Sequence, residues 1–347
     1  MGTDTTALDA AKDLGTAKDI ARAAKGTAGD TARDAARYEA AAAILPSRLR
    51  RLALALPRER QGEAEEIRLR AGQPLTVLLP EGERRPERVR AVPNGAVPDD
   101  GPVEPEELET LCDLATEFSR YAAAETIREG FLSVRGGFRV GLCGSVVMKG
   151  GVSTNLSRLS SAAVRIARER KDAGREVAPL LFRDGQFQSA LLLSPPGGGK
   201  TTLLRDLVRR LSTGVEGYGP RRVALIDERG EAAAMVQGLP QLDVGPHTDV
   251  LDGCPKALGI PMVLRAMNPQ IIAVDEITVP EDIHAAVMAS GCGAGLLATV
   301  HAGSIDDLRS KPLYRDLLDA GVFRLAVRIT RTAEGRRYQV EGLPCGS

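Results

Sequence analysis

The sequence predicts an α/β fold with a mostly parallel sheet, preceded by a small α+β domain. From residue 186 onward, short apolar runs alternate with amphipathic segments, a pattern typical of parallel strands with helices on both faces. A glycine-rich loop joins the first of these strands to the first helix, and two later apolar runs end in Asp-Glu. At roughly 100 to 200 residues per domain, a chain of 347 residues suggests about two domains.

Composition divides the chain into four stretches. Residues 1–43 are rich in alanine with hardly any large apolar side chain, so we expect a disordered or marginally helical tail. Residues 44–170 mix helix and strand patterns and are expected to form the small α+β domain. Residues 171–185 are polar and are expected to be a hinge, and residues 186–347 are expected to form the α/β core.

Hydrophobic spacing predicts the elements of both domains. In the small domain we expect helices at 44–56 and 105–128, an exposed hairpin or loop at 80–105, a final element at 159–168, and strands at 66–70, 75–79, 131–134 and 138–147. In the core we expect helices at 200–211 and 281–289 and strands at 189–193, 222–226, 271–274 and 296–300.

Charge and composition argue against several classes of ligand. The 46 basic and 46 acidic residues balance, whereas nucleic acid or anionic lipid usually demands a basic excess, and an aromatic fraction of 3% disfavours base stacking. No apolar run is long enough to span a bilayer, and the five cysteines form no C-x-x-C pair. We therefore expect a cytoplasmic protein without a transmembrane segment or a direct nucleic-acid ligand. Such a protein would reach a membrane through a protein partner.

The loop between strand 189–193 and helix 200–211 predicts a nucleotide site. The Walker A pattern asks for glycine at its first position, where this chain has Ser194. Glycines still let successive backbone N–H groups form an anion-binding nest at the positive end of the helix. Lys200 would reach the β- and γ-phosphates, and the Thr201 hydroxyl would ligate Mg²⁺. An ordinary glycine-rich turn is the alternative. The candidate nucleotide-binding residues are Ser194, Pro195, Pro196, Gly197, Gly198, Gly199, Lys200, Thr201 and Thr202.

Two apolar runs end in Asp-Glu and predict the acidic side of the site. The carboxyl ends of strands line the ligand crevice of an open parallel sheet. Asp275 would hold Mg²⁺ and Glu276 would polarise the attacking water. The other run ends in Asp227 and Glu228, and the sequence leaves open whether Glu228 or Glu276 is the base. Either strand alone could end in a solvated acidic turn, but both together make that interpretation weaker.

His301 follows the apolar run 296–300 and is a third candidate catalytic residue. At a strand end beside the phosphate loop it could sense the γ-phosphate through a hydrogen bond. A lone histidine is equally well explained as a packed side chain with satisfied hydrogen bonds, so the assignment depends on the other motifs.

The order of these motifs resembles the secretion ATPases of type II, type IV pilus and type IV secretion systems. The loop at 194–202, residues 226–231, the block 264–277 and residues 299–301 correspond to their Walker A, Asp box, Walker B and His box. Within that superfamily the chain is similar to the stage III sporulation protein AA family, through residues 238–245 and 248–256 and, in the N-terminal unit, 65–70 and 136–144. The resemblance covers residues 44 to 329.

The resemblance implies a RecA-like P-loop core that binds ATP and Mg²⁺ and hydrolyses ATP. It also implies a homo-oligomer, a hexameric ring in many members, that works with membrane channel proteins. Its task would be to energise assembly of, or transport through, the channel between mother cell and forespore during endospore formation. Arg139, Arg165 and Arg265 are candidates to neutralise transition-state charge.

Two other functions remain open on the sequence. A nucleic-acid-directed P-loop motor or loader would use the same core, but no appended nucleic-acid module is visible and the charge is balanced. A nucleotide-bound assembly factor that never hydrolyses ATP is disfavoured by the intact pair Asp275 and Glu276.

Overall fold

The computed structural model describes residues 18–20, 28–86, 100–121, 123–149, 152–166, 171–332 and 335–343. The chain forms two compact units. Unit 1 comprises Met1–Lys25, Glu169–Ala233 and Leu242–Ser347, and unit 2 comprises Gly26–Arg168 together with Ala234–Gln241. Within the described ranges, no helix has both the length and the apolar character needed to cross a membrane.

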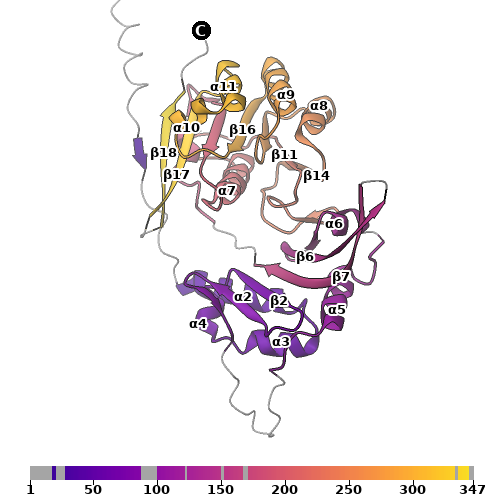
Figure 1. The fold of residues 1–347 in the computed structure, drawn as a ribbon. Coiled ribbons are helices and arrows are strands. Elements are labelled where there is room, and N and C mark those ends of the chain that lie inside the picture. The colour runs from indigo at the N-terminus through magenta and orange to yellow at the C-terminus, as the bar shows by residue number, and fades with distance from the viewer. Residues whose placement is uncertain are drawn as a thin grey trace, which may run out of the picture. The chain divides into compact units, whose positions relative to one another are not determined.

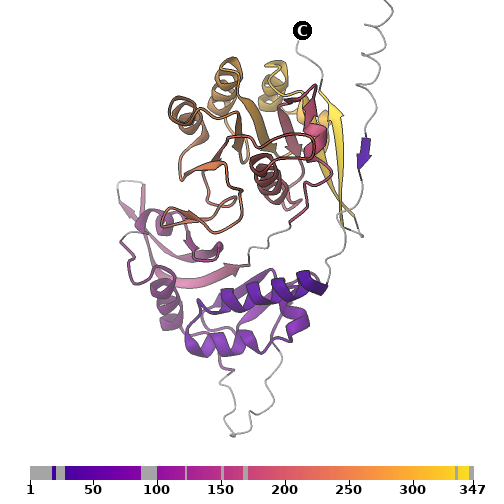
Figure 2. The ribbon, with the colours of Figure 1, turned by 180° about the vertical axis from the view of Figure 1, so that it is seen from behind.

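Unit 1 contains an eight-stranded sheet in the order β1-β18-β17-β10-β16-β15-β11-β14. The six strands from β17 to β14 are parallel, and β18 runs antiparallel to both β17 and β1. Figure 1 shows the β17–β18 hairpin and β14 toward opposite edges, and the yellow hairpin also lies at an edge in the rear view of Figure 2. The predicted α/β fold with a mostly parallel sheet is confirmed. The strands are β1 (Lys18–Ile20), β10 (Ala190–Leu193), β11 (Val223–Asp227), β14 (Thr248–Asp252), β15 (Ile271–Val274), β16 (Gly295–Val300), β17 (Leu325–Thr332) and β18 (Gly335–Gly342).

Helices cover both faces of this sheet. Strand β10 is buried throughout, so its side chains point alternately to two covered faces. Leu191 and Leu193 lie in one core cluster with residues of α8, α9 and α11. Leucines at helical spacing, including Leu203 and Leu207, bury α7 against the opposite face. The helices are α7 (Lys200–Thr213), α8 (Lys256–Met267), α9 (Pro280–Gly291), α10 (Ile305–Ser310) and α11 (Pro312–Asp319).

The stretch expected to be a hinge, 171–185, differs in the structure. It contains a 3₁₀ helix, η1 (Ala178–Leu181), followed by β8 (Phe182–Arg183), which pairs with β9 (Gln186–Phe187). Val177 and Leu181 are fully buried within unit 1. Apolar residues among the polar ones explain the difference, because their burial anchors the segment to the core.

Unit 2 contains a six-stranded antiparallel sheet in the order β4-β3-β2-β7-β6-β5. Residues 234–241 add a small two-stranded sheet. Gln241, directly after this sheet, accepts a hydrogen bond from the backbone N–H of Gly136 at 3.0 Å. The strands are β2 (Glu66–Arg70), β3 (Thr76–Leu79), β4 (Gly82–Arg84), β5 (Phe131–Val134), β6 (Phe138–Lys149), β7 (Val152–Arg165), β12 (Met235–Val236) and β13 (Leu239–Pro240). The element expected at 159–168 is thus part of the longer β7, and residues 87–99 of the expected loop lie outside the described residues.

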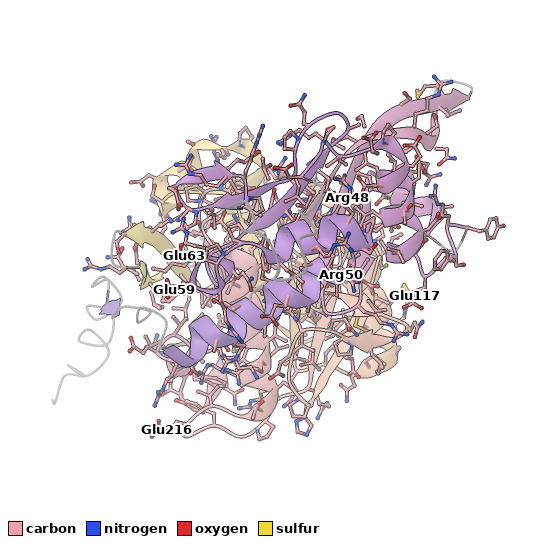
Figure 3. All side chains as sticks on the ribbon, turned by 90° about the horizontal axis from the view of Figure 1, so that it is seen from below. Arg48, Arg50, Glu59, Glu63, Glu117 and Glu216 are labelled. Atoms are coloured by element: carbon pink, nitrogen blue, oxygen red, sulfur yellow. The ribbon has the colours of Figure 1, made fainter. Side chains whose placement is uncertain are left out.

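The helices of unit 2 are α2 (Ala28–Ala42), α3 (Ser47–Leu54), α4 (Arg58–Gln61), α5 (Pro105–Ala115) and α6 (Ala124–Arg128). The single helix expected at 105–128 is therefore two, because Glu117 and Phe118 adopt left-handed φ values of 50° and 62°. Arg48 and Arg50 both project from α3 (Figure 3), and Arg48 donates from Nε to Oε1 of Glu107 at 2.8 Å. This bond ties α3 to the first turn of α5.

Helix α2 differs from the expected tail. Its residues Ala35, Tyr38 and Ala41 are buried, and Tyr38 donates its hydroxyl to the carbonyl of Ala53 at 2.8 Å. Burial also raises the pKa of Tyr38 above its usual range. The small alanine side chains let the helix approach its neighbours, and tertiary packing supplies the stability that isolated helices lack. Residues 1–17 and 21–27 of the expected tail lie outside the described residues.

Candidate functional site

The loop after β10 adopts a conformation that requires glycine. Ser194 is fully buried, and a Cβ on Gly198 would lie 1.5 Å from its Oγ, so no side chain fits there. Gly199 precedes α7 with a φ of 100°, a value that side chains disfavour. The loop therefore wraps tightly around Ser194 and delivers its backbone to the start of α7, as an anion-binding nest requires.

Lys200 is buried at the first turn of α7, with 7% of its surface exposed. Its Nζ donates to the carbonyl of Ser194 at 3.0 Å and lies 2.7 Å from Nδ1 of His301. Burial lowers the pKa of Lys200, while the charges of Glu276 and Asp275 act in the opposite direction. The site thus holds a partly desolvated cation beside two carboxylates, and a bound anion would stabilise its charge further.

Asp275 lies at the carboxyl end of β15 and connects two hydroxyl groups. Thr201 donates to its Oδ2 at 2.8 Å, and Thr299 donates to its Oδ1 at 2.7 Å. Strand β16, which carries Thr299, lies between β10 and β15 in the sheet. The phosphate loop and the acidic strand end therefore meet across one intervening strand.

Glu276 is held from several sides. Its backbone has a left-handed φ of 51°, and its N–H donates to the Thr299 hydroxyl at 2.8 Å. Its Oε1 lies 2.7 Å from Nε2 of His301, and its Oε2 lies 3.4 Å from Arg229. A left-handed conformation in a non-glycine residue is uncommon and is maintained here by these contacts.

The second acidic strand end is arranged differently. Asp227 is buried and accepts hydrogen bonds from the backbone N–H groups of Glu231 at 2.9 Å and Ala233 at 2.8 Å, so it shapes a turn. Glu228 forms an ion pair with the buried Lys256 of α8. The structure brings Glu276 to His301 and Lys200, and it brings Glu228 to Lys256.

The donor set beside the loop suits a hard divalent cation. The Thr201 hydroxyl and the Asp275 carboxylate supply oxygen ligands, which Mg²⁺ prefers. In the part of the chain that the structure describes, no group of three or more His, Cys, Asp or Glu side chains is placed to hold a metal ion. A magnesium ion here would therefore depend on this hydroxyl, this carboxylate and phosphate oxygens together.

Sequence reasoning missed several residues that support the site. Thr299 belongs to the segment 299–301 that resembles the His box, but the sequence assigned no role to its hydroxyl, which contacts Asp275 and Glu276. Lys256, within the family-like block 248–256, pairs with Glu228. Arg205 on α7 donates to the carbonyls of Ala232 at 2.6 Å and Glu231 at 3.0 Å, which fixes the turn after Asp227.

The three candidate arginines lie in separate surroundings. In unit 2 the guanidinium of Arg139 stacks 3.9 Å from the centre of the Phe131 ring, and Arg165 lies 3.5 Å from Glu66. Arg265 is exposed in the last turn of α8. Nothing in these contacts selects one of them for the nucleotide site.

The RecA-like P-loop fold is defined by a parallel sheet, a glycine loop between a strand and a helix, and an acidic strand end that faces this loop. Solved secretion ATPases share it. The pilus retraction motor PilT, solved with bound ADP, is 17% identical with a TM-score of 0.53, covering 82% of this chain and 80% of that chain. The ATPase DotB of Legionella pneumophila is 15% identical with a TM-score of 0.50, covering 80% of this chain and 75% of that chain.

The chain belongs to the stage III sporulation protein AA family, whose model (Sporulation stage III, protein AA) matches residues 35–343. Stage III sporulation protein AA of Bacillus subtilis (strain 168) is 32% identical over 290 residues, which cover 84% of this chain and 90% of the relative. The family predicted from the sequence is confirmed. The match begins inside α2, in agreement with the packing of that helix in unit 2.

Proposed function

We propose that this chain is a Mg²⁺-dependent ATPase. The observation that carries the proposal is the 2.8 Å contact between the Thr201 hydroxyl of the loop and the carboxylate of Asp275. It brings together the two oxygen ligands that a magnesium ion on a nucleotide would use. The fold shared with PilT, which was solved with bound ADP, supports nucleotide binding.

The residues of the loop then have distinct roles. Residues 194–202 would surround the phosphates, with backbone N–H groups from the residues other than Pro195 and Pro196, which have none, and Lys200 would neutralise the phosphate charge. Thr201 and Asp275 would hold Mg²⁺, which supplies charge stabilisation to phosphoryl transfer. His301, in contact with Lys200, is placed to respond to the presence of the terminal phosphate.

We assign the general base to Glu276 rather than Glu228. Glu276 lies next to the metal ligand Asp275 and contacts His301 at 2.7 Å, so its carboxylate is oriented toward the loop cation. Glu228 is paired with Lys256, which neutralises its charge and commits its carboxylate to α8. A base must accept the proton of the attacking water while that water adds to the γ-phosphorus.

Three matched variants test the assignment in a phosphate-release assay with ATP binding measured in parallel. Lys200→Ala should lose turnover, and Glu276→Gln should bind ATP but hydrolyse it about 100-fold to 10,000-fold more slowly, the usual contribution of a general base. Glu228→Gln is the isosteric control and should keep most of the turnover. Measurable hydrolysis by pure Lys200→Ala protein would contradict the ATPase assignment, and a larger loss in Glu228→Gln would move the base to Glu228.

We further propose that hydrolysis energises assembly of, or transport through, the mother cell–forespore channel during endospore formation. Family membership supports this role. The protein would act as a homo-oligomer, a hexameric ring, at the cytoplasmic face, and channel proteins would recruit it to the membrane. In the organism that encodes it, chromosomal Glu276→Gln should block sporulation, and native mass measurement with and without ATP should reveal the ring. Normal spores from that strain would refute the role of hydrolysis.

Two further measurements distinguish the alternative functions from the proposed one. A motor or loader directed to nucleic acid would shift single-stranded DNA in a salt-dependent gel-shift assay, whereas the balanced charge predicts no shift at physiological salt. A nucleotide-bound assembly factor would bind ATP and release no phosphate in the oligomeric state. Turnover by the wild-type oligomer excludes it.

A further inference from the structure

The β17–β18 hairpin reaches the phosphate-binding loop. Arg336, near the start of β18, donates from Nε to the carbonyl oxygen of Gly198 at 2.9 Å. Its guanidinium also occupies the space beside Gly199, where a Cβ would lie 2.5 Å from Nε. The loop and the arginine are therefore complementary in shape as well as in hydrogen bonding.

This contact acts on one peptide unit, the one that joins Gly198 to Gly199. In a trans peptide the C=O and the following N–H point in opposite directions. Because Arg336 holds the carbonyl of Gly198, the N–H of Gly199 is directed away from the arginine. A nest binds an anion through such N–H groups, and a charged donor on the carbonyl also polarises the peptide toward better donation.

A second observation concerns the cross-strand neighbour of Arg336. The register of the hairpin places Arg331 directly opposite Arg336, and like charges in that position destabilise a strand pair. Within the described residues, which leave out 333 and 334, neither arginine forms an ion pair with a carboxylate. A polyanion bound at the adjacent loop would be attracted by this local excess of positive charge.

We infer that Arg336 is a positioning residue for the nucleotide phosphates. It acts through the peptide between Gly198 and Gly199, and it makes the C-terminal hairpin a working part of the nucleotide site. The inference rests on the proposed function, because it presupposes that the loop binds a nucleotide. Since binding linkage is reciprocal, nucleotide should also order the hairpin that positions its site.

The test measures the affinity of the full-length protein for a fluorescent ATP analogue with Mg²⁺. Arg336→Met should weaken binding about tenfold to 100-fold, the usual effect of losing a hydrogen bond from a charged donor. Arg337→Met is the matched control: it removes the same charge from the next residue, which is exposed and points to the other face of the strand. It should change the affinity by no more than about threefold. Arg336→Lys keeps the charge without the guanidinium and should recover only part of the loss.

The outcomes separate this inference from the proposed function. If the wild-type protein does not bind the analogue, the proposed function itself fails. If wild-type and Arg337→Met proteins bind and Arg336→Met binds as tightly, the inference is wrong and the function stands. If Arg336→Met and Arg337→Met weaken the binding of the analogue equally, or if Arg336→Lys binds as tightly as wild type, Arg336 contributes only its charge. Either result would contradict its role as a positioning residue.

Hydrogen exchange on the wild-type protein gives a readout that needs no variant. Nucleotide should slow amide exchange in β17 and β18, and an unchanged hairpin in a protein that binds nucleotide would contradict the inference. In Arg336→Met that nucleotide-dependent protection should be absent, whereas Arg337→Met should retain it. A residue that merely stabilised the hairpin would alter exchange equally with and without nucleotide.

Discussion

The Nε2 atom of His301 lies 2.7 Å from Oε1 of Glu276. The other ring nitrogen, Nδ1, lies 2.7 Å from Nζ of Lys200, which is itself a donor. For Nδ1 to accept this bond, the proton of a neutral imidazole must sit on Nε2 and be donated to Glu276. His301 is thus not an isolated packed side chain, since it connects the loop cation to the candidate base.

Removal of the imidazole should therefore affect turnover more than binding. In His301→Ala we expect kcat to fall about tenfold to 100-fold, because Glu276 loses the group that orients it, while the Kd for ATP changes less than about threefold. Steady-state kinetics and equilibrium binding measure the two quantities. His284→Ala, on the exposed side of α9, serves as the control and should match wild type. A Kd that rises as much as kcat falls would mean that His301 only supports the loop.

The lowered pKa of Lys200 predicts how ATP affinity depends on pH. Burial favours the neutral amine, against the charges of Glu276 and Asp275, whereas bound phosphates favour the ammonium. ATP should therefore bind at full strength below the lowered pKa and more weakly as pH rises through it, at a pH lower than the ordinary lysine value of 10.5.

Binding measured from about neutral pH to about pH 10 should reveal this loss of affinity. The stability of the protein without nucleotide depends on pH in the opposite direction. Because the pKa of Lys200 is lower in the folded than in the unfolded protein, stability increases as pH rises from the folded-state pKa to the ordinary value. Lys200→Arg, whose guanidinium stays charged, is the control for the binding series. An identical pH dependence in wild type and Lys200→Arg would show that another group is responsible.

Thr299 should contribute to both stability and activity. Its buried hydroxyl donates to Asp275 at 2.7 Å and accepts from the N–H of Glu276 at 2.8 Å. Thr299→Val keeps the shape but leaves both partners without that hydroxyl, so we expect a loss of about 1–3 kcal/mol in the free energy of unfolding. The left-handed backbone of Glu276 would also lose support, and turnover should fall.

Chemical denaturation and phosphate release measure these two effects. Thr299→Ser retains the hydroxyl and is the control that separates hydrogen bonding from the missing methyl group. A valine variant as stable as wild type would show that the hydroxyl contributes nothing to stability, whatever the serine variant loses with its methyl group.

The sequence predicted those parts of the site that follow from local patterns. A glycine loop between strand and helix and the runs that end at Asp275 and Asp227 are visible within a few residues. Glu228 and Glu276 follow equivalent runs, and only their partners, Lys256 and His301, distinguish them. Those partners come from elements remote in sequence, so the choice between the two acids required the fold.

The edge hairpin illustrates the same limit. The apolar and polar residues at 325–332 alternate over part of their length, so a strand there could have been predicted. The contact of Arg336 with Gly198 joins residues 138 positions apart, and it depends on β17 pairing directly with β10. No local pattern contains that pairing.

The difference at residues 28–43 leads to a final prediction about Tyr38. The low apolar content of this stretch suggested a tail, yet α2 buries the whole tyrosine ring in the core of unit 2. Tyr38→Ala should therefore destabilise unit 2 by about 3–5 kcal/mol, the usual cost of removing a buried aromatic ring. Tyr121→Ala removes the same atoms from a position that is 95% exposed and should change stability by less than about 0.5 kcal/mol. Chemical denaturation of the full-length variants compares them. Equal free energies of unfolding for the two variants would mean that α2 does not pack against the rest of unit 2 in solution and that the domain begins nearer residue 44.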